Sequence, residues 1–227
     1  MPLLGRAVMI AMYDVSPGWN ARHDDWHSHE HMEERVSIGG FLRGRRYVAH
    51  SGSPHYFVLY EAADKPSLVG EEYLARLNNP TAWSTELMPH FTNMQRTICD
   101  VSRSFGLGVG GQMAYVPLRV PAEHQDAARD KLSRSLELIA QEPGTLAAHL
   151  CEGDHEASGI QTAEKALRGG QDNMAEWLLI VEGYESVATH FQTGALAADA
   201  LTRAGATSSG SVSTYVLGAL LPQTDLG

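Results

Sequence analysis

The spacing of apolar and polar positions predicts alternating strands and helices in the first half of the chain. Four runs are short and either apolar or alternating at every second residue, which is typical of β-strands. Three stretches repeat their apolar residues every three or four positions, which is typical of helices. The strands are expected at 7–15, 41–51, 55–63 and 94–103, and the helices at 20–38, 67–77 and 81–90.

The second half follows the same order. Its strands are expected at 113–120, 146–152, 177–182 and 211–221, and its helices at 123–141 and 187–203. Each half therefore has the β-α-β-β-α-β order of a ferredoxin-like unit. The third strands end alike, in Leu59-Tyr60-Glu61 and Ile180-Val181-Glu182. A polar stretch at about 154–173 interrupts the second half, and its pattern fits a short helix as well as a loop.

A glycine-rich segment at 106–111 separates the halves and predicts two units, residues 1–106 and 107–227. It does not match a phosphate-binding loop, because no Gly-Lys-Ser/Thr follows and the next segment has the pattern of a strand. One antiparallel sheet with helices on one side leaves its other face bare, so two such sheets are expected to cover each other. The predicted fold class is α+β, with two tandem ferredoxin-like units packed as an α/β barrel within one chain.

The bulk composition narrows the range of partners. A formal net charge of −10 argues against nucleic acid or an anionic membrane. No apolar run reaches the roughly 18 to 20 residues of a membrane span, and the N-terminus lacks the features of a signal peptide. Two cysteines, Cys99 and Cys151, are too few for a disulfide scaffold. We expect a cytoplasmic protein with a small-molecule substrate, and the sequence leaves self-association into a homo-oligomer open.

The densest group of chemically active side chains is His-Asp-Asp-Trp-His-Ser-His-Glu-His-Met-Glu-Glu at 23–34. His23, His27 and His31 are spaced at i, i+4 and i+8, so on a helix they form one stripe. Histidine titrates near neutral pH and serves as acid, base or metal ligand, whereas a solvated helix face is the ordinary alternative. The clustering favours a functional site near the N-terminus.

Within this cluster the predicted catalytic residues are His31 as general base and His27 as a second proton-transfer group. Glu34 or Glu30 is expected to orient His31, because a neighbouring carboxylate positions an imidazole and raises its pKa. His27 and His31 also have the spacing of two helical metal ligands, although the second position of His29-Glu30-x-x-Glu33 departs from the zinc-protease motif. No metal is favoured, and a cofactor-free acid/base site is the expectation.

Substrate-binding candidates lie on the neighbouring elements. Arg46 is the arginine expected to bind an anion, while Arg43 and Arg45 share the opposite face of their strand and are expected at the exposed edge, paired with carboxylates. The other predicted binding residues are His90, Trp83, Tyr13 and Tyr60. For His90 a helix-capping role, and for the aromatic residues plain packing, are the alternatives.

Several short runs carry a family resemblance. Trp26, Glu30-His31, Glu34-Arg35, Gly40-Phe41 and Arg45-Arg46-Tyr47 resemble the W…EH…ER…GF…RRY run of EthD-like proteins in the dimeric α/β-barrel superfamily. The match covers about the first 105 residues, and the second half fits by element order alone. The resemblance implies a barrel with a pocket between each sheet and its helices, and it makes His31 the histidine of the motif.

The superfamily that this resemblance implies includes cofactor-free monooxygenases, isomerases, dehydratases and haem enzymes, so fold alone does not choose the reaction. We expect a cofactor-independent acid/base enzyme, of lyase, dehydratase or isomerase type, that acts on a small aromatic or carboxylate-bearing molecule. The alternatives are a cofactor-free monooxygenase and a non-catalytic small-molecule-binding protein. Haem is not expected, although His149 and His190 would be its candidate ligands. The second half is expected to be scaffold.

Overall fold

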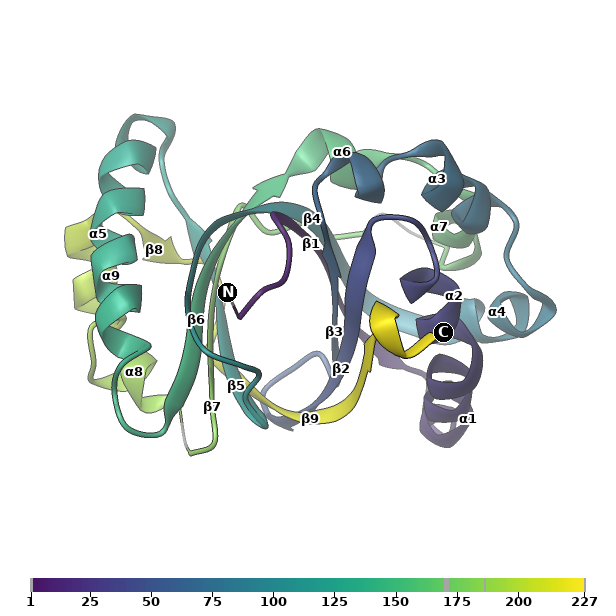
Figure 1. Cartoon of the computed structure of the whole chain (residues 1–227), viewed down its shortest axis with the longest axis horizontal. Helices are drawn as coiled ribbons and strands as arrows, with labels where there is room; N and C mark the ends of the chain where they lie inside the picture. Colours follow the sequence, from purple (N-terminus) through teal and green to yellow (C-terminus); the bar gives the residue numbers. More distant parts are fainter. Residues whose placement is uncertain (1, 170–171, 186, 227) are drawn as a thin grey trace.

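The computed structural model describes residues 2–169, 172–185 and 187–226, and its strands close into a barrel with helices on two opposite sides (Figure 1). The strands follow one another in the order β7-β6-β4-β1-β3-β2-β9-β5, and β5 pairs with β7 to complete the ring. All of these pairings are antiparallel. The barrel strands are β1 (Ala7–Val15), β2 (Phe41–Ser51), β3 (Tyr56–Ala62), β4 (Phe91–Gly106), β5 (Gln112–Arg119), β6 (Thr145–Asp154), β7 (Trp177–Gly183) and β9 (Ser213–Pro222). The two-residue strand β8 (Thr207–Ser208) pairs with β5 outside the ring.

Two seams join the halves of the chain. The last strand of the first half, β4, pairs with β6, and the last strand of the second half, β9, pairs with β2. Each sheet thereby continues into the other, and the barrel closes without a second subunit. The predicted fold class, two ferredoxin-like units packed as one α/β barrel, is confirmed.

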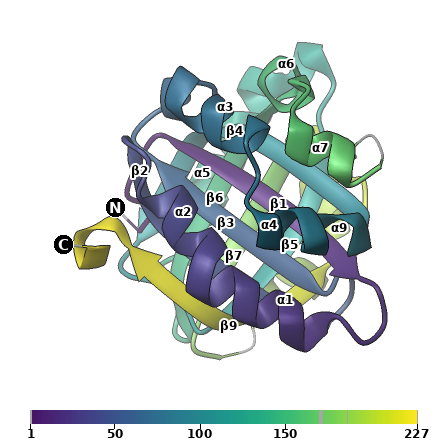
Figure 2. The same cartoon turned by 90° about the vertical axis from the view of Figure 1, so that its right-hand side faces the viewer.

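Helices cover the outer face of each sheet. Against the first sheet lie α1 (Asn20–Trp26), the π-helical segment His27–His31, α2 (Met32–Val36), α3 (Glu71–Asn78) and α4 (Ala82–Leu87), with 3₁₀ turns at Pro66–Leu68 and Met88–His90. Against the second lie α5 (Gln125–Ile139), α8 (Thr189–Gln192) and α9 (Ala198–Ala204), with a 3₁₀ turn at Ala122–His124. The C-terminal 3₁₀ turn at Gln223–Leu226 lies against β2 and β9, on the side of the first sheet (Figure 1). The polar insertion forms α6 (His155–Gly159), which packs on β4 and β6, and α7 (Ala163–Leu167), which lies beside α3 and α4 over the first sheet (Figure 2).

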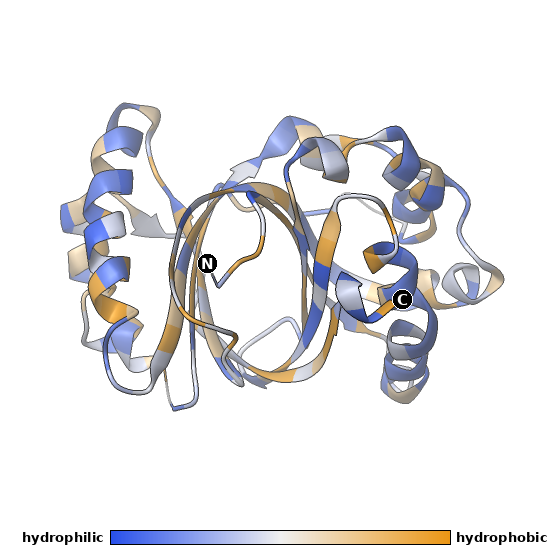
Figure 3. Ribbon diagram, viewed as in Figure 1, coloured by the Kyte–Doolittle hydropathy of each residue, from blue (hydrophilic) through white to orange (hydrophobic). Residues whose placement is uncertain are grey.

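The apolar side chains form three layers, as the period of two along each strand requires. One cluster, including Tyr47, Phe57 and Tyr215, fills the barrel interior. The other two lie between each sheet and its helices, around Trp26 in the first half and Leu132 in the second. Polar residues dominate the outward helix faces, whereas the strands are mostly apolar (Figure 3).

Three helices differ from the sequence prediction. The expected helix at 67–77 is divided into the 3₁₀ turn Pro66–Leu68 and α3, which begins at Glu71. The expected helix at 187–203 is broken into α8 and α9, because Gly194 packs against the backbone of His190, where a Cβ would come within 2.9 Å. The expected helix at 20–38 is continuous but changes to π-helix over His27–His31. In an α-helix, positions four apart drift by about 40° around the axis. The wider π-turn reduces this drift, which helps to keep the histidine stripe facing the sheet.

Within the described ranges, no helix combines the length and the apolar character needed to cross a bilayer.

Candidate active site

A small cavity lies between the outer face of the first sheet and the helices that cover it. Its volume is about 40 Å³, which gives room for about two or three water molecules. The polar residues of its wall are Tyr13, His27, His31, Arg35, Tyr60, Tyr73, Arg96, Glu164 and Arg168, and three methionines, Met9, Met88 and Met94, are among the apolar ones. The histidine-bearing helix and the tyrosines of β1 and β3 therefore meet at one site.

The histidine stripe faces the sheet. His23 and His27 are fully buried, and only 12% of the His31 side chain is exposed. The Tyr13 hydroxyl and His23 Nε2 lie 2.9 Å apart, and the Tyr60 hydroxyl and His27 Nε2 lie 3.4 Å apart. The ring of His31 stacks on Trp26 with a centroid separation of 4.2 Å. The structure thus brings together four predicted site residues, namely His27, His31, Tyr13 and Tyr60.

Burial sets the electrostatics of these imidazoles. It lowers the pKa of His27 well below the ordinary value, and the neighbouring His31 lowers it further. Burial likewise lowers the pKa of His31, with an added contribution from Arg35. Both rings are therefore neutral near pH 7. Each has a buried Nδ1 that forms no hydrogen bond with the described residues.

The two predicted orienting carboxylates have different partners. Glu34 Oε2 lies 3.6 Å from His31 Nδ1, close enough for an ion pair but too long for a hydrogen bond. Glu30 instead accepts a 2.6 Å hydrogen bond from the Thr81 hydroxyl at the N-cap of α4. Glu34 is thus placed beside His31, whereas Glu30 joins two helices and does not contact the histidine.

The second half of the chain supplies part of the wall. Glu164 of α7 forms a buried ion pair with Arg35 of α2, and burial raises the pKa of Glu164 even though Arg35 opposes the shift. Arg168 also lines the cavity and pairs with Asp172 at 2.9 Å. Beyond the scaffold role expected of it, the second half contributes residues to the cavity wall, because its insertion covers the cavity.

Three predicted binding residues lie outside the cavity. Arg46 is buried on the helix side of β2, where Nη1 donates to the Asp24 carbonyl at 3.1 Å. His90 stacks on Trp19 with a centroid separation of 3.5 Å. Trp83 is partly buried against the apolar layer. None of the three is in the cavity wall.

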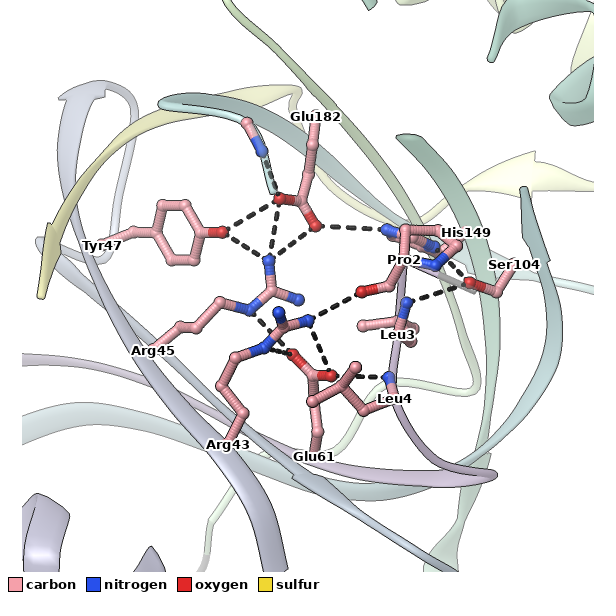
Figure 4. A network of polar contacts seen from close by, with 11 residues as sticks. Pro2, Leu3, Leu4, Arg43, Arg45, Tyr47, Glu61, Ser104, His149 and Glu182 are labelled. Carbon is pink, nitrogen blue, oxygen red and sulfur yellow. Dashed lines mark hydrogen bonds and ion pairs between the residues drawn. The ribbon is translucent and has the colours of Figure 1, made fainter. Parts of the chain in front are cut away.

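Besides the cavity, a cluster of polar side chains lies inside the barrel, next to the apolar residues there. Its members come from both sheets (Figure 4). Arg45 lies between two carboxylates, with Nε 3.0 Å from Glu61 Oε1 and Nη1 2.8 Å from both oxygens of Glu182. Arg43 binds Glu61 through two hydrogen bonds and also donates to the Pro2 carbonyl. Arg43 and Arg45 do share a face and pair with carboxylates, but the expected exposure at a sheet edge is wrong.

The histidines named as candidate haem ligands both form hydrogen bonds within the protein. His149 Nδ1 lies 3.1 Å from the Ser104 hydroxyl, and Nε2 lies 3.1 Å from Glu182 Oε1 inside the barrel. His190 Nε2 lies 3.0 Å from the Thr145 hydroxyl. Among the described residues, no group of three or more His, Cys, Asp or Glu side chains is arranged to hold a metal ion.

Sequence reasoning missed Arg96, Glu164 and Arg168. Arg96 had a usable signal, because the strand period of two places it on the same face as Met94 and Ile98, and an arginine among inward apolar positions is unusual. Glu164 and Arg168 are spaced at i and i+4, which placed them on one helix face but gave no indication of the sheet they would cover.

No protein-family model matches the sequence, and no curated protein matches it. Solved structures do match over nearly the whole chain. A protein provisionally called a monooxygenase, from Fusobacterium nucleatum, gives a TM-score of 0.63 at 10% identity, covering 96% of this chain and 95% of that one. An anthrone oxidase-like protein gives 0.61 at 14% identity, with 98% and 96% covered. Another provisionally named monooxygenase, from Lactobacillus acidophilus, gives 0.61 at 10% identity, with 96% and 97% covered. At these identities the likeness establishes the fold alone, that of the dimeric α/β barrels.

Proposed function

We propose that the protein is a small-molecule enzyme in which His31 and His27 move a proton on a weakly acidic organic substrate without a cofactor. The observation that carries the proposal is the pair of buried neutral imidazoles in the wall of one cavity, each with an Nδ1 that forms no hydrogen bond with the described residues. Buried polar atoms without hydrogen-bond partners are uncommon, and a catalytic role or a bound water or ion is among their explanations.

The low dielectric of the cavity suits proton abstraction. A neutral imidazole is ready to accept a proton near pH 7. When a C–H or O–H bond of the substrate breaks, the imidazolium and the new enolate or phenolate form an ion pair that is strengthened by exclusion of water. The nearby anion then raises the pKa of the imidazole toward the range required of a general base.

The proposed roles follow from the contacts. His31 is the base, and Glu34 at 3.6 Å stabilises its imidazolium. If His27 Nε2–H donates to the Tyr60 oxygen, the Nδ1 lone pair stays free to accept a second proton. The EthD-like resemblance of Glu30-His31 and Glu34-Arg35 supports the pairing of His31 as base with Glu34 as its carboxylate. The overall reaction would be an isomerisation, dehydration or lyase step on an aromatic or carboxylate-bearing molecule.

A cofactor-free monooxygenase is the second candidate, favoured by the names of the matching structures. Its first step is the same, since proton removal gives a carbanion that can pass electrons to dioxygen. Oxidation of anthrone illustrates the balance: anthrone and dioxygen give anthraquinone and water. A binding protein without turnover is the third candidate, and it requires ligand affinity to survive loss of His31.

The test uses anthrone, whose methylene hydrogens are weakly acidic. Under nitrogen in deuterated buffer, proton NMR measures exchange of these hydrogens, and an oxygen electrode measures uptake under air. The variants are His31→Asn and His27→Asn, and His29→Asn is the matched control because His29 is exposed on the same helical turn. We expect the His31 change to slow wild-type exchange by about 10²- to 10⁴-fold, the usual contribution of a general base.

Each outcome separates the candidates. Exchange without oxygen uptake supports isomerase or lyase chemistry, and exchange with uptake and anthraquinone formation supports the monooxygenase. Binding of anthrone without either reaction supports a binding protein. Equal exchange in wild type and His31→Asn would contradict the assignment of the base.

A further inference from the structure

Arg96 is a buried cation with no carboxylate partner among the described residues. It lies on β4 and is 9% exposed, and its guanidinium lines the same cavity as His27 and His31. Its Nη2 donates a 3.3 Å hydrogen bond to the Tyr73 hydroxyl, which is a neutral group. A buried charge without a counter-charge is costly, so the site favours a ligand that brings one.

The other cations of the wall are already paired. Arg35 lies beside both Glu164 and Glu34, and Arg168 is bound to Asp172. These ion pairs leave the guanidinium of Arg96 as the cavity-lining cation without a carboxylate among the residues that the structure describes. An entering anion therefore finds its complementary charge at Arg96.

A second hollow of about 220 Å³ adjoins the cavity and gives a ligand more room. It is lined by Thr92, Asn93, Asp172 and Asn173, together with Phe91, Met94 and Arg168, which also line the inner cavity. Met94 is flexible and can move aside to join the two spaces. Asn93 has a φ of +53°, an uncommon conformation for a residue other than glycine that is often kept at functional sites.

We propose that Arg96 binds the carboxylate of the substrate, so that the protein acts on a small aromatic or enolic monocarboxylate. This inference rests on the proposed function, which places the proton-transfer groups in the same cavity. The planar guanidinium holds the carboxylate through two parallel hydrogen bonds. The body of the ligand extends past Met94 toward the outer hollow, within reach of the neutral imidazoles.

The test compares benzoate with benzamide, a neutral molecule of the same shape, by calorimetry at fixed ionic strength. The wild type is expected to prefer benzoate. Arg96→Met is expected to weaken benzoate binding by roughly 10- to 100-fold while leaving benzamide nearly unchanged, as loss of charged hydrogen bonds predicts. Arg96→Lys keeps the positive charge but loses the two-pronged guanidinium, so its benzoate affinity should lie between those of the wild type and Arg96→Met. Arg119→Met, at a 70% exposed arginine side chain, is the control and should behave as wild type.

Thermal unfolding separates a binding role from a structural one. If Arg96 is a binding residue for an anion, Arg96→Met removes a buried charge that has no counter-charge in the ligand-free protein. The ligand-free variant should then have a melting temperature no lower than that of the wild type, and benzoate should no longer raise it. A lowered melting temperature with benzoate affinity intact would overturn the inference, as would a wild type that binds benzoate no better than benzamide.

The outcome is independent of the proton-transfer test. Benzoate offers no proton to abstract, so its binding should persist in His31→Asn. Failure of exchange both for anthrone and for phenylpyruvate, a carbon acid that carries a carboxylate, with retained, Arg96-dependent benzoate binding would reject the acid/base function alone. Normal exchange without benzoate selectivity would reject the carboxylate class alone.

Discussion

Removal of the Glu182 charge should strongly destabilise the protein. Glu182 is buried inside the barrel, and both of its oxygens lie 2.8 Å from Arg45 Nη1. The Tyr47 hydroxyl and the Gly110 amide also donate to its Oε2, each at 3.1 Å. In Glu182→Gln the side chain keeps its size, but Arg45 is left to share Glu61, which already neutralises Arg43.

The magnitude follows from the cost of an uncompensated buried charge, about 3–5 kcal/mol. For a chain of this size each kcal/mol lowers the melting temperature by roughly 2–4 °C, so the fall should be of the order of 10 °C. Urea unfolding followed by circular dichroism measures the change. Asp199→Asn is the control, because Asp199 pairs with Arg203 on the surface and its loss should cost less than about 1 kcal/mol.

Two further measurements decide whether the ion pair is the cause. The double variant Arg45→Met with Glu182→Gln should recover much of the unfolding free energy lost in Glu182→Gln, because it also removes the buried cation that Glu182 neutralises. The Arg45 guanidinium holds the pKa of Glu182 well below its ordinary value despite burial. Stability from this group is therefore present above about pH 4.5 and declines as the pH falls below it, a decline that the Gln variant should lack. A loss no greater than that of Asp199→Asn, or a double variant with additive losses, would refute the reasoning.

Two other predictions concern stability. Burial lowers the pKa of His27, so this histidine takes up a proton below about pH 6.5 in the unfolded chain but stays neutral in the native state. The free energy of unfolding should therefore fall as the pH drops from about 6.5 to 5. His27→Asn should flatten this slope in urea titrations, and an unchanged slope would exclude His27 as its source. Gly110→Ala should cost about 1–3 kcal/mol by thermal melting, because the new Cβ would lie 2.3 Å from the Gly183 amide nitrogen. Gly111→Ala, with open space around the Cβ, should be nearly neutral, and equal effects at the two positions would contradict this packing argument.

The features that local periodicity controls were predictable from sequence. A spacing of four placed His27 and His31 on one helix face, and a period of two separated Arg45 from Arg46 across the strand. The choice between Glu30 and Glu34 was not predictable, because both follow a histidine at i+3. The choice depends on Thr81 at the start of another helix, whose hydroxyl donates a hydrogen bond to Glu30.

Long-range contacts account for the rest. Glu164 meets Arg35 across 129 positions of sequence, and no local pattern indicates where a short polar insertion will pack. Arg96 is significant because no carboxylate among the described residues pairs with it, and this is a property of the folded environment. The ion pairs of the barrel interior depend in the same way on strands β2, β3 and β7 converging.

Closure of the barrel within one chain permits an asymmetry that identical subunits do not have. In a dimer of two identical units, every insertion occurs twice, and any change to one pocket is imposed on the other. Here α6 and α7 occur once, cross the seam between β4 and β6, and cover the histidine-bearing side alone. The opposite helix layer is free to fill with apolar side chains. Because both halves lie in one chain, one helix layer can carry the insertion and the buried histidines while the other has a different cover.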